Sequence, residues 1–111
     1  MEKRKSPRVD VSRPVLYFTD IYGRPKVAST RNLSLGGTRI ETSYGLIAGE
    51  RLEVTIPIQP QAITCRGKTV YVLCPESGKM EAGIQFEELS EYDKLYLKEY
   101  LTPLLDPHAS S

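Results

Sequence analysis

Histidine and cysteine are scarce in this sequence, with one histidine and two cysteines among 111 residues. His108 lies in a tail rich in proline, serine and alanine, so neither a histidine zinc site nor a cysteine–histidine nucleophile has its parts in place. Cys65 and Cys74 are nine residues apart in a segment typical of a strand, which separates them by roughly 30 Å unless the chain bends. Because no base–nucleophile pair is visible either, we expect two reduced thiols in the core, no metal, no catalytic residue and no enzymatic activity.

Long apolar runs and an export signal are also missing. No run approaches the about 18 residues that a membrane-spanning helix needs, and the charged start does not resemble the apolar part of a signal peptide. Fifteen Lys and Arg residues against fourteen Asp and Glu residues give a net charge of +1, so overall charge indicates neither a nucleic-acid polymer nor a membrane surface as partner. These absences favour a cytoplasmic protein without membrane insertion.

The length fits one domain with its own core, because a chain of this size buries roughly two-thirds of its unfolded surface. Residues 1–11 are basic and polar, and residues 2–8 hold four basic side chains against one acidic. Such a segment has little apolar surface to bury, so we expect a flexible arm that stays mobile unless an anion holds it. Residues 12–102 are then the folded domain, and residues 103–111 are a disordered tail.

Alternating apolar and polar residues predict strands with one buried face each. The expected ranges are 15–19, 26–33, 38–42, 52–58, 62–73 and 80–86. Along 62–73 the apolar positions change from odd numbers at Ile63 and Cys65 to even numbers at Val70 and Val72, which requires one extra residue. Gly67 is the natural place for that β-bulge, and bulges let a small sheet curl into a barrel.

A helix is predicted after residue 90. Ser90 and Asp93 have the spacing of a capping box, with Ser90 as the N-cap, and Pro103 is expected to end or kink the helix. A stripe suited to packing on the barrel follows at Leu97, Tyr100, Leu101 and Leu104. Tyrosines recur at every fourth position from Tyr92 to Tyr100, and we interpret them as packing residues rather than base-stacking platforms. The sequence thus predicts a compact, mainly antiparallel β-barrel with a terminal α-helix.

Two groups of residues stand apart from the strand pattern. In the arm, Arg4 and Arg8 are separated by three residues, and each guanidinium can bind a phosphate or a guanine edge through two hydrogen bonds. Asn32 and Ser34 project from the same strand face, where an amide and a hydroxyl can bind a base. The following Gly36–Gly37 pair carries no Cβ, so a flat ring can approach the backbone. Together these groups indicate a site for a purine-bearing anion.

Each group also has an ordinary interpretation. A basic N-terminal arm is commonly a solvated tail. An Asn-x-Ser sequence before Gly-Gly is commonly turn chemistry, in which the side chains bond the local backbone. The combination of the two groups, rather than either alone, carries the hypothesis.

The order of these motifs resembles the signature of the PilZ family of bacterial cyclic-di-GMP receptors. In that signature Arg-x-x-x-Arg is followed by strands and then by Asn-x-Ser-x-x-Gly. The matching residues here are Arg4, Arg8, Asn32, Ser34 and Gly37. Residues 83–86 are similar to a late strand of the family, and the capped helix lies where its C-terminal helix is expected. The resemblance spans about residues 2–102. It implies a mainly all-β fold, a small antiparallel six-stranded β-barrel of the split-barrel type with a C-terminal α-helix.

The resemblance also implies which residues bind cyclic-di-GMP, the expected ligand, with no other cofactor. Arg4 and Arg8 would contact guanine Hoogsteen edges and phosphates. Asn32 and Ser34 would hold a guanine, and Gly37 would leave room for it. Further ligand contacts are expected from Lys3, Lys5, Arg31, Gly36 and Arg39. Asn32 replaces an aspartate that many relatives carry, which keeps an acceptor oxygen and removes its charge.

We expect a stand-alone receptor in which ligand binding orders the arm on the barrel and alters contacts with an effector protein that the sequence does not identify. Each charge-assisted contact contributes about 1.5–3 kcal/mol, against about 1–2 kcal/mol of backbone entropy per ordered residue. Two alternatives remain open: a PilZ-like interaction adaptor that binds no nucleotide, and a small nucleic-acid-binding barrel. The nucleic-acid-binding barrel is disfavoured because aromatic residues whose position in the strand alternation is clear, such as Phe86, are expected to point inward.

Overall fold

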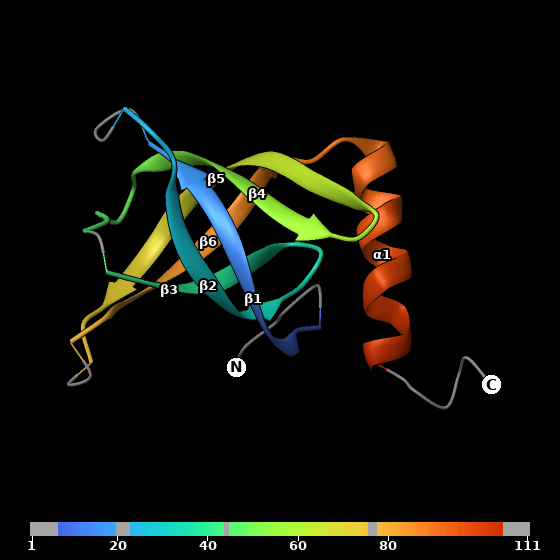
Figure 1. The fold of residues 1–111 in the computed structure, drawn as a ribbon, viewed down its shortest axis with the longest axis horizontal. Coiled ribbons are helices and arrows are strands. Elements are labelled where there is room, and N and C mark those ends of the chain that lie inside the picture. The colour runs from blue at the N-terminus through green and yellow to red at the C-terminus, as the bar shows by residue number, and fades with distance from the viewer. Residues whose placement is uncertain (1–6, 20–22, 44, 76–77, 106–111) are drawn as a thin grey trace.

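Six antiparallel strands and one helix form the described part of the chain in a computed structural model, namely residues 7–19, 23–43, 45–75 and 78–105. The strands are β1 (Val9–Phe18), β2 (Lys26–Leu33), β3 (Gly37–Thr42), β4 (Arg51–Ile58), β5 (Gln61–Leu73) and β6 (Met80–Glu88), and the helix is α1 (Glu91–Leu105). The strands close into a barrel in the order β1-β2-β3-β6-β5-β4 (Figure 1). The predicted six-stranded barrel with a C-terminal helix is confirmed.

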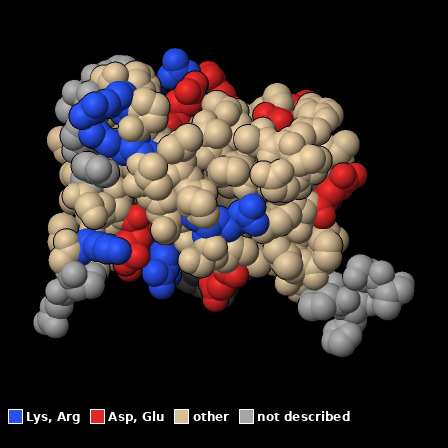
Figure 2. All heavy atoms as spheres, in the orientation of Figure 1, with Lys and Arg blue, Asp and Glu red and all other residues tan. Residues whose placement is uncertain are grey.

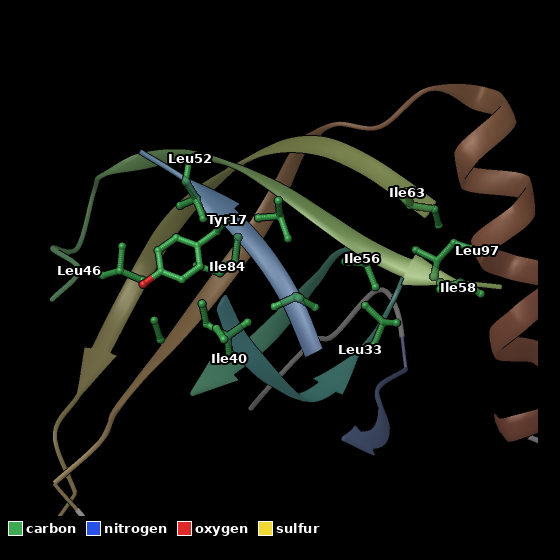
Figure 3. Packing of buried hydrophobic residues seen from close by; sticks show 14 of the residues in the cluster. Tyr17, Leu33, Ile40, Leu46, Leu52, Ile56, Ile58, Ile63, Ile84 and Leu97 are labelled. Carbon is green, nitrogen blue, oxygen red and sulfur yellow. The ribbon is translucent and has the colours of Figure 1, made fainter. Parts of the chain in front are cut away.

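The inward-facing side chains of the strands fill the barrel interior (Figure 3). On β4 the alternation predicted the buried face correctly, since Leu52, Val54, Ile56 and Ile58 are each at most 3% exposed. Tyr17 of β1 points across the interior toward Leu46. Its buried hydroxyl lies 2.8 Å from Thr42 Oγ1, so the polar atom is hydrogen-bonded inside the apolar core.

The expected boundary of the arm at residue 11 is wrong, because β1 begins at Val9. Val9 is the register partner of Leu33 at the end of β2, and both Val9 and Val11 pack against the core. The alternation of these two valines lies among charged and polar residues, which hid it in the sequence. The described chain therefore enters the barrel directly after Arg8.

The predicted change of parity in β5 is present, but its place differs from the expected one. Ile63, Cys65, Gly67 and Thr69 all face inward, and the extra residue on β5 is Val70, which is 48% exposed instead of buried. The register also shifts between Arg66 and Gly67, but there the extra residue lies on β6. Gly67 has another role. A Cβ there would lie 2.8 Å from Ile84 Cγ2, so the glycine permits a close approach of β5 and β6.

Helix α1 packs its buried residues on the end of the barrel next to the β4–β5 hairpin (Figure 3). Its start is capped as predicted, because the Asp93 amide donates to Ser90 Oγ over 3.0 Å. Leu97 and Leu101 are 0% and 2% exposed, whereas Leu104 is 45% exposed, so the packed stripe is shorter than expected. The helix runs past Pro103 to Leu105, so this proline does not end it, although it cannot donate the backbone hydrogen bond to the preceding turn. The expected tail from residue 103 is thus helical over its first three residues.

The helix tyrosines attach α1 to the barrel through their hydroxyls. Tyr92 accepts a hydrogen bond from Gln61 Nε2 over 2.9 Å, and the Tyr96 hydroxyl donates to the Ile58 carbonyl. Tyr100 accepts from Arg13 Nη1 over 3.1 Å, and the guanidinium lies 5.6 Å from the centre of its ring. Tyr96 and Tyr100 also pack against the core, as predicted, whereas Tyr92 is 63% exposed.

Both cysteines are free, but only Cys65 lies in the core as expected, because Cys74 follows the end of β5 and is exposed, and we predict different reactivities for them. Burial raises the pKa of Cys65 to about 12, helped by the charges of Asp93 and Glu53, while Cys74 is exposed. Because the thiolate is the reactive form, iodoacetamide at neutral pH should label Cys74 and spare Cys65, and urea should make both reactive. Peptide mass spectrometry reads out both sites. Equal labelling of both thiols in the folded protein would contradict this burial.

The same pKa predicts loss of stability at alkaline pH. A thiol that stays protonated in the folded state and ionises near its ordinary value in the unfolded state releases its proton on unfolding. The stabilising contribution is complete below about pH 9 and is lost as the pH rises from there toward about 12.

Candidate functional site

The β2–β3 turn contains the Asn-x-Ser-x-x-Gly residues, and Ser34 organises it. Its hydroxyl accepts hydrogen bonds from the amides of Gly36 (3.1 Å) and Gly37 (3.2 Å) and donates to the Gly37 carbonyl over 3.3 Å. A serine hydroxyl has one donor and two acceptor positions, so these three bonds use its whole capacity. The turn interpretation therefore holds for Ser34, whose hydroxyl fixes the backbone of the two glycines.

Asn32 is the buried polar group of the site. Its side chain is only 6% exposed, yet Oδ1 has no hydrogen-bond partner among the described residues. Its main-chain carbonyl accepts from Thr38 Oγ1 over 2.7 Å, which holds the backbone in place. An unpaired buried acceptor costs about 1–3 kcal/mol, so a donor that reaches this oxygen recovers that free energy.

Gly37 is needed by the barrel itself. It pairs with Gln85 on β6, and a Cβ at this position would overlap the carbonyl oxygen of Ile84. The close contact is with backbone, which cannot turn away as a side chain can. The missing Cβ at Gly37 therefore makes room for the backbone of β6, whereas the resemblance implied that it makes room for a ligand.

The pairing of β1 with β2 brings the arm to this turn. Val9 is the partner of Leu33, and Asp10 is the partner of Asn32. Arg8 is exposed and directly precedes this pair, so it leaves the sheet beside Ser34. The other predicted arm residues, Lys3, Arg4 and Lys5, lie outside the described residues.

A polar hollow of about 390 Å³ adjoins Asn32 on the outer surface of the barrel. It is lined by Asp10, Val11, Ser12, Arg31 and Arg39. Two of the expected ligand residues, Arg31 and Arg39, are therefore brought together with the start of β1. The sequence analysis did not single out Asp10 or Ser12. Their proximity to Asn32 depends on the β1–β2 register, and no local motif marks it.

Both arginines of the hollow already have acidic neighbours. Arg31 Nη1 lies 3.2 Å from Glu41 Oε1, and Arg39 Nε lies 4.0 Å from Glu81 Oε1. Arg39 Nε is also buried without a hydrogen-bond acceptor. These partly exposed pairs are weak, so an anionic ligand can compete for the guanidinium groups.

Basic and acidic side chains alternate over the face of the molecule shown in Figure 2, without a continuous basic track. A single-stranded nucleic acid needs such a track together with exposed stacking aromatics. Among the described residues, no helix has the length and apolar character that crossing a bilayer requires. The arrangement suits a small ligand with both anionic groups and hydrogen-bonding rings.

The described chain is thus a small closed barrel with a capped helix at one end and a polar surface beside its β2–β3 turn. The family model described as PilZ domain matches residues 2–102, and the chain belongs to this family. No match is found among curated protein sequences. The resemblance drawn from the Arg-x-x-x-Arg and Asn-x-Ser-x-x-Gly motifs is thereby confirmed.

Solved structures of similar fold include proteins of three bacteria. The inhibitor of motility MotI/DgrA of Bacillus subtilis superimposes with a TM-score of 0.81 at 17% identity, over 100% of this chain and 54% of that one. The MrkH–c-di-GMP complex of K. pneumonia gives 0.76 at 15% identity, over 100% and 57%. YcgR of Escherichia coli in complex with c-di-GMP gives 0.76 at 16% identity, over 98% and 49%. The chain thus spans about half the length of these proteins.

Proposed function

We propose that this chain is a receptor for cyclic-di-GMP, which binds over the β2–β3 turn and the start of β1. The observation that carries the proposal is the pairing of Val9 with Leu33 and of Asp10 with Asn32. This pairing brings the backbone at Arg8, whose guanidinium offers several donors, to the end of β2 that carries Asn32, a buried amide whose oxygen has no hydrogen-bond partner among the described residues. Membership of the PilZ family, and the c-di-GMP complexes of MrkH and YcgR, support this choice of ligand. The proposed role is binding, not catalysis.

The chemistry of the ligand fits the residues of the site. Cyclic-di-GMP has two anionic phosphates and two guanines, whose O6 and N7 atoms accept hydrogen bonds from arginine. In the proposal, Arg4 and Arg8 bind these atoms and the phosphates, and Arg39 adds positive charge from β3. Asn32 Oδ1 accepts a guanine N–H. Ser34 acts as a positioning residue, because its hydroxyl is already saturated by the turn.

We further propose that binding fixes the arm on the barrel and creates a surface for a separate effector protein. Each guanidinium–ligand contact contributes about 1.5–3 kcal/mol, and fixing a residue costs about 1–2 kcal/mol of backbone entropy. Residues 9–11 are already paired in β1, so their entropy is not part of that cost. Only the residues before Val9 are involved, and ordering the five residues from Arg4 to Arg8 costs about 5–10 kcal/mol, so contacts of both arginines and of the neighbouring lysines are needed to offset it.

Replacing Arg8 with alanine should weaken cyclic-di-GMP binding by about 10- to 100-fold, since one charge-assisted contact pair is lost. Isothermal titration calorimetry gives the Kd and the stoichiometry. The matched control is Arg24→Ala, an exposed arginine between β1 and β2 at the far end of that hairpin. Equal affinities of the wild type and Arg8→Ala would contradict the proposed site.

The same variants test the partner. A pull-down with cyclic-di-GMP should retain an effector that is lost without the ligand and lost again with Arg8→Ala at a concentration that saturates only the wild type. An identical set of retained proteins in all these samples would oppose ligand-dependent docking. If the wild type gives no heat with the nucleotide but still retains a protein, the receptor hypothesis is wrong. The alternative, an interaction adaptor that binds no nucleotide, then replaces it.

A further inference from the structure

We propose that Asp10 reads the guanine base in the hollow beside Asn32, as the acceptor for the ring N1–H and the exocyclic N2–H. The inference rests on the proposed binding of cyclic-di-GMP and assigns part of that ligand to a defined place. It makes Asp10 a specificity-determining residue at the end of β1. The strand register, the shape of the hollow and the balance of charge support this role.

The strand register places three polar side chains in one row on the barrel surface. Asp10 on β1 is the partner of Asn32 on β2, and Asn32 is in turn the partner of Arg39 on β3. Residues paired in this way lie on the same face, with Cβ atoms about 4.5–5.5 Å apart. The row therefore offers a carboxylate acceptor, a buried amide and a guanidinium donor in sequence. The unpartnered Oδ1 of Asn32 lies in the middle of the row.

The shape of the hollow follows from two irregularities in the strands. The β1–β2 register shifts between Asp10 and Arg13, and the β2–β3 register shifts between Thr30 and Asn32. Bulges of this kind bend a strand and re-aim its side chains, and they are common beside binding sites. The residues within the two shifts, Val11, Ser12 and Arg31, are the ones that line the hollow with Asp10 and Arg39. The opening is thus built into the backbone next to the row.

The balance of charge decides which part of the ligand faces Asp10. Arg31 and Arg39 have Glu41 and Glu81 as neighbours, whereas none of the described residues forms an ion pair with the Asp10 carboxylate. A carboxylate accepts hydrogen bonds only, so it repels a phosphate and attracts N–H groups. Guanine presents two N–H donors side by side on its Watson–Crick edge. Adenine presents a ring acceptor beside its amino group and does not match.

Asp10 supplies an ionised hydrogen-bond acceptor, which the neutral amide of Asn32 does not. An amide oxygen accepts an N–H from guanine as a neutral group, and a hydrogen bond to an ionised acceptor is roughly twice as strong. Asp10 brings the ionised oxygen to the same row from the neighbouring strand. The discrimination between guanine and other bases then depends on β1, and Arg8 directly precedes this strand.

The test compares cyclic-di-GMP with its di-inosine analogue, which lacks only the exocyclic amino group of each base. The wild type should bind cyclic-di-GMP about tenfold more tightly than the analogue, by calorimetry of the full chain. In Asp10→Ala the affinity for cyclic-di-GMP should fall about 30-fold and the affinity for the analogue, which keeps the ring N1–H, about threefold, so the preference should disappear. The isosteric Asp10→Asn should show a smaller loss, because it keeps an acceptor oxygen without the charge.

The matched control is Glu53→Ala, which also removes one exposed carboxylate. Glu53 lies on β4 and pairs with Phe18, at the other end of β1 from Asp10. This variant should keep both affinities, and an unchanged thermal midpoint shows that each variant is folded. If the wild type binds and prefers cyclic-di-GMP while Asp10→Ala keeps that preference, the role of Asp10 is refuted and the receptor function stands. If the wild type gives no heat with either nucleotide, the receptor function itself fails, and the role of Asp10 with it.

Discussion

Replacing Gly37 with alanine should lower the free energy of unfolding by about 3 kcal/mol or more, or prevent folding altogether. The new Cβ would overlap the Ile84 carbonyl oxygen, and it would also lie 3.2 Å from the Ile84 carbonyl carbon and 3.3 Å from Gln85 Cα. All three atoms belong to the β6 backbone, so the β3–β6 pairing must open to make room. Urea denaturation followed by circular dichroism measures the loss. An unchanged urea midpoint would refute this close approach.

Gly83 provides the matched comparison, because the atoms in its way belong to a side chain. A Cβ at Gly83 would overlap the ring of Tyr71 on β5. Gly83→Ala should therefore be costly in the wild type and much less costly in a Tyr71→Ala background, which a double-mutant cycle quantifies. No side-chain truncation can relieve Gly37→Ala in this way. Equal costs of Gly83→Ala in both backgrounds would show that the ring is not the obstacle.

The second large effect is expected for Leu97→Ala, which should cost about 2–5 kcal/mol of unfolding free energy. Leu97 is fully buried and lies beside Ile58 and Ile63, where α1 meets the barrel (Figure 3). Truncation leaves a cavity between the helix and the β4–β5 hairpin. The hydroxyl contacts of Tyr92 and Tyr96 then hold the helix without its central apolar anchor.

Leu95→Ala is the control for this prediction. Leu95 lies on the same helix and undergoes the same chemical change, but it is 57% exposed. Its replacement should alter the unfolding free energy by less than about 0.5 kcal/mol. Thermal and urea unfolding of the two variants under one set of conditions gives the comparison. Similar losses for both leucines would contradict the packing of α1 described above.

The sequence predicted those parts of the fold in which one strand face is buried and local residues decide the pattern. β2 has its expected bounds, and the Leu52–Ile58 alternation matches the buried face of β4. The start of β1 was missed because the burial of Val9 depends on Leu33, which lies far away in the sequence. The bulge was misplaced because an extra residue at Gly67 or at Val70 changes the parity equally, and only the register with β6 distinguishes them.

The candidate site was predictable to the extent that it follows a local motif. The spacing of Asn32 and Ser34 identified the turn, but the saturation of the Ser34 hydroxyl depends on backbone positions that no spacing reveals. Asp10 could not be found in this way, since its partner Asn32 lies on the next strand. Arg4 belongs to the motif and lies outside the described residues, so its role stays a prediction.

Closure of the barrel limits how another protein can recognise this domain. Each of the six strands has a neighbour on both sides, but β1 pairs with β4 only from Leu16 to Phe18, so the first part of β1 has no partner among the described strands on that side. A binding protein can extend the sheet with a strand of its own, which is a common mode of peptide capture, only at this short gap. Elsewhere recognition must use side chains on the outside of the cylinder, the connecting loops or the helix, and this directs interface mutagenesis to those groups.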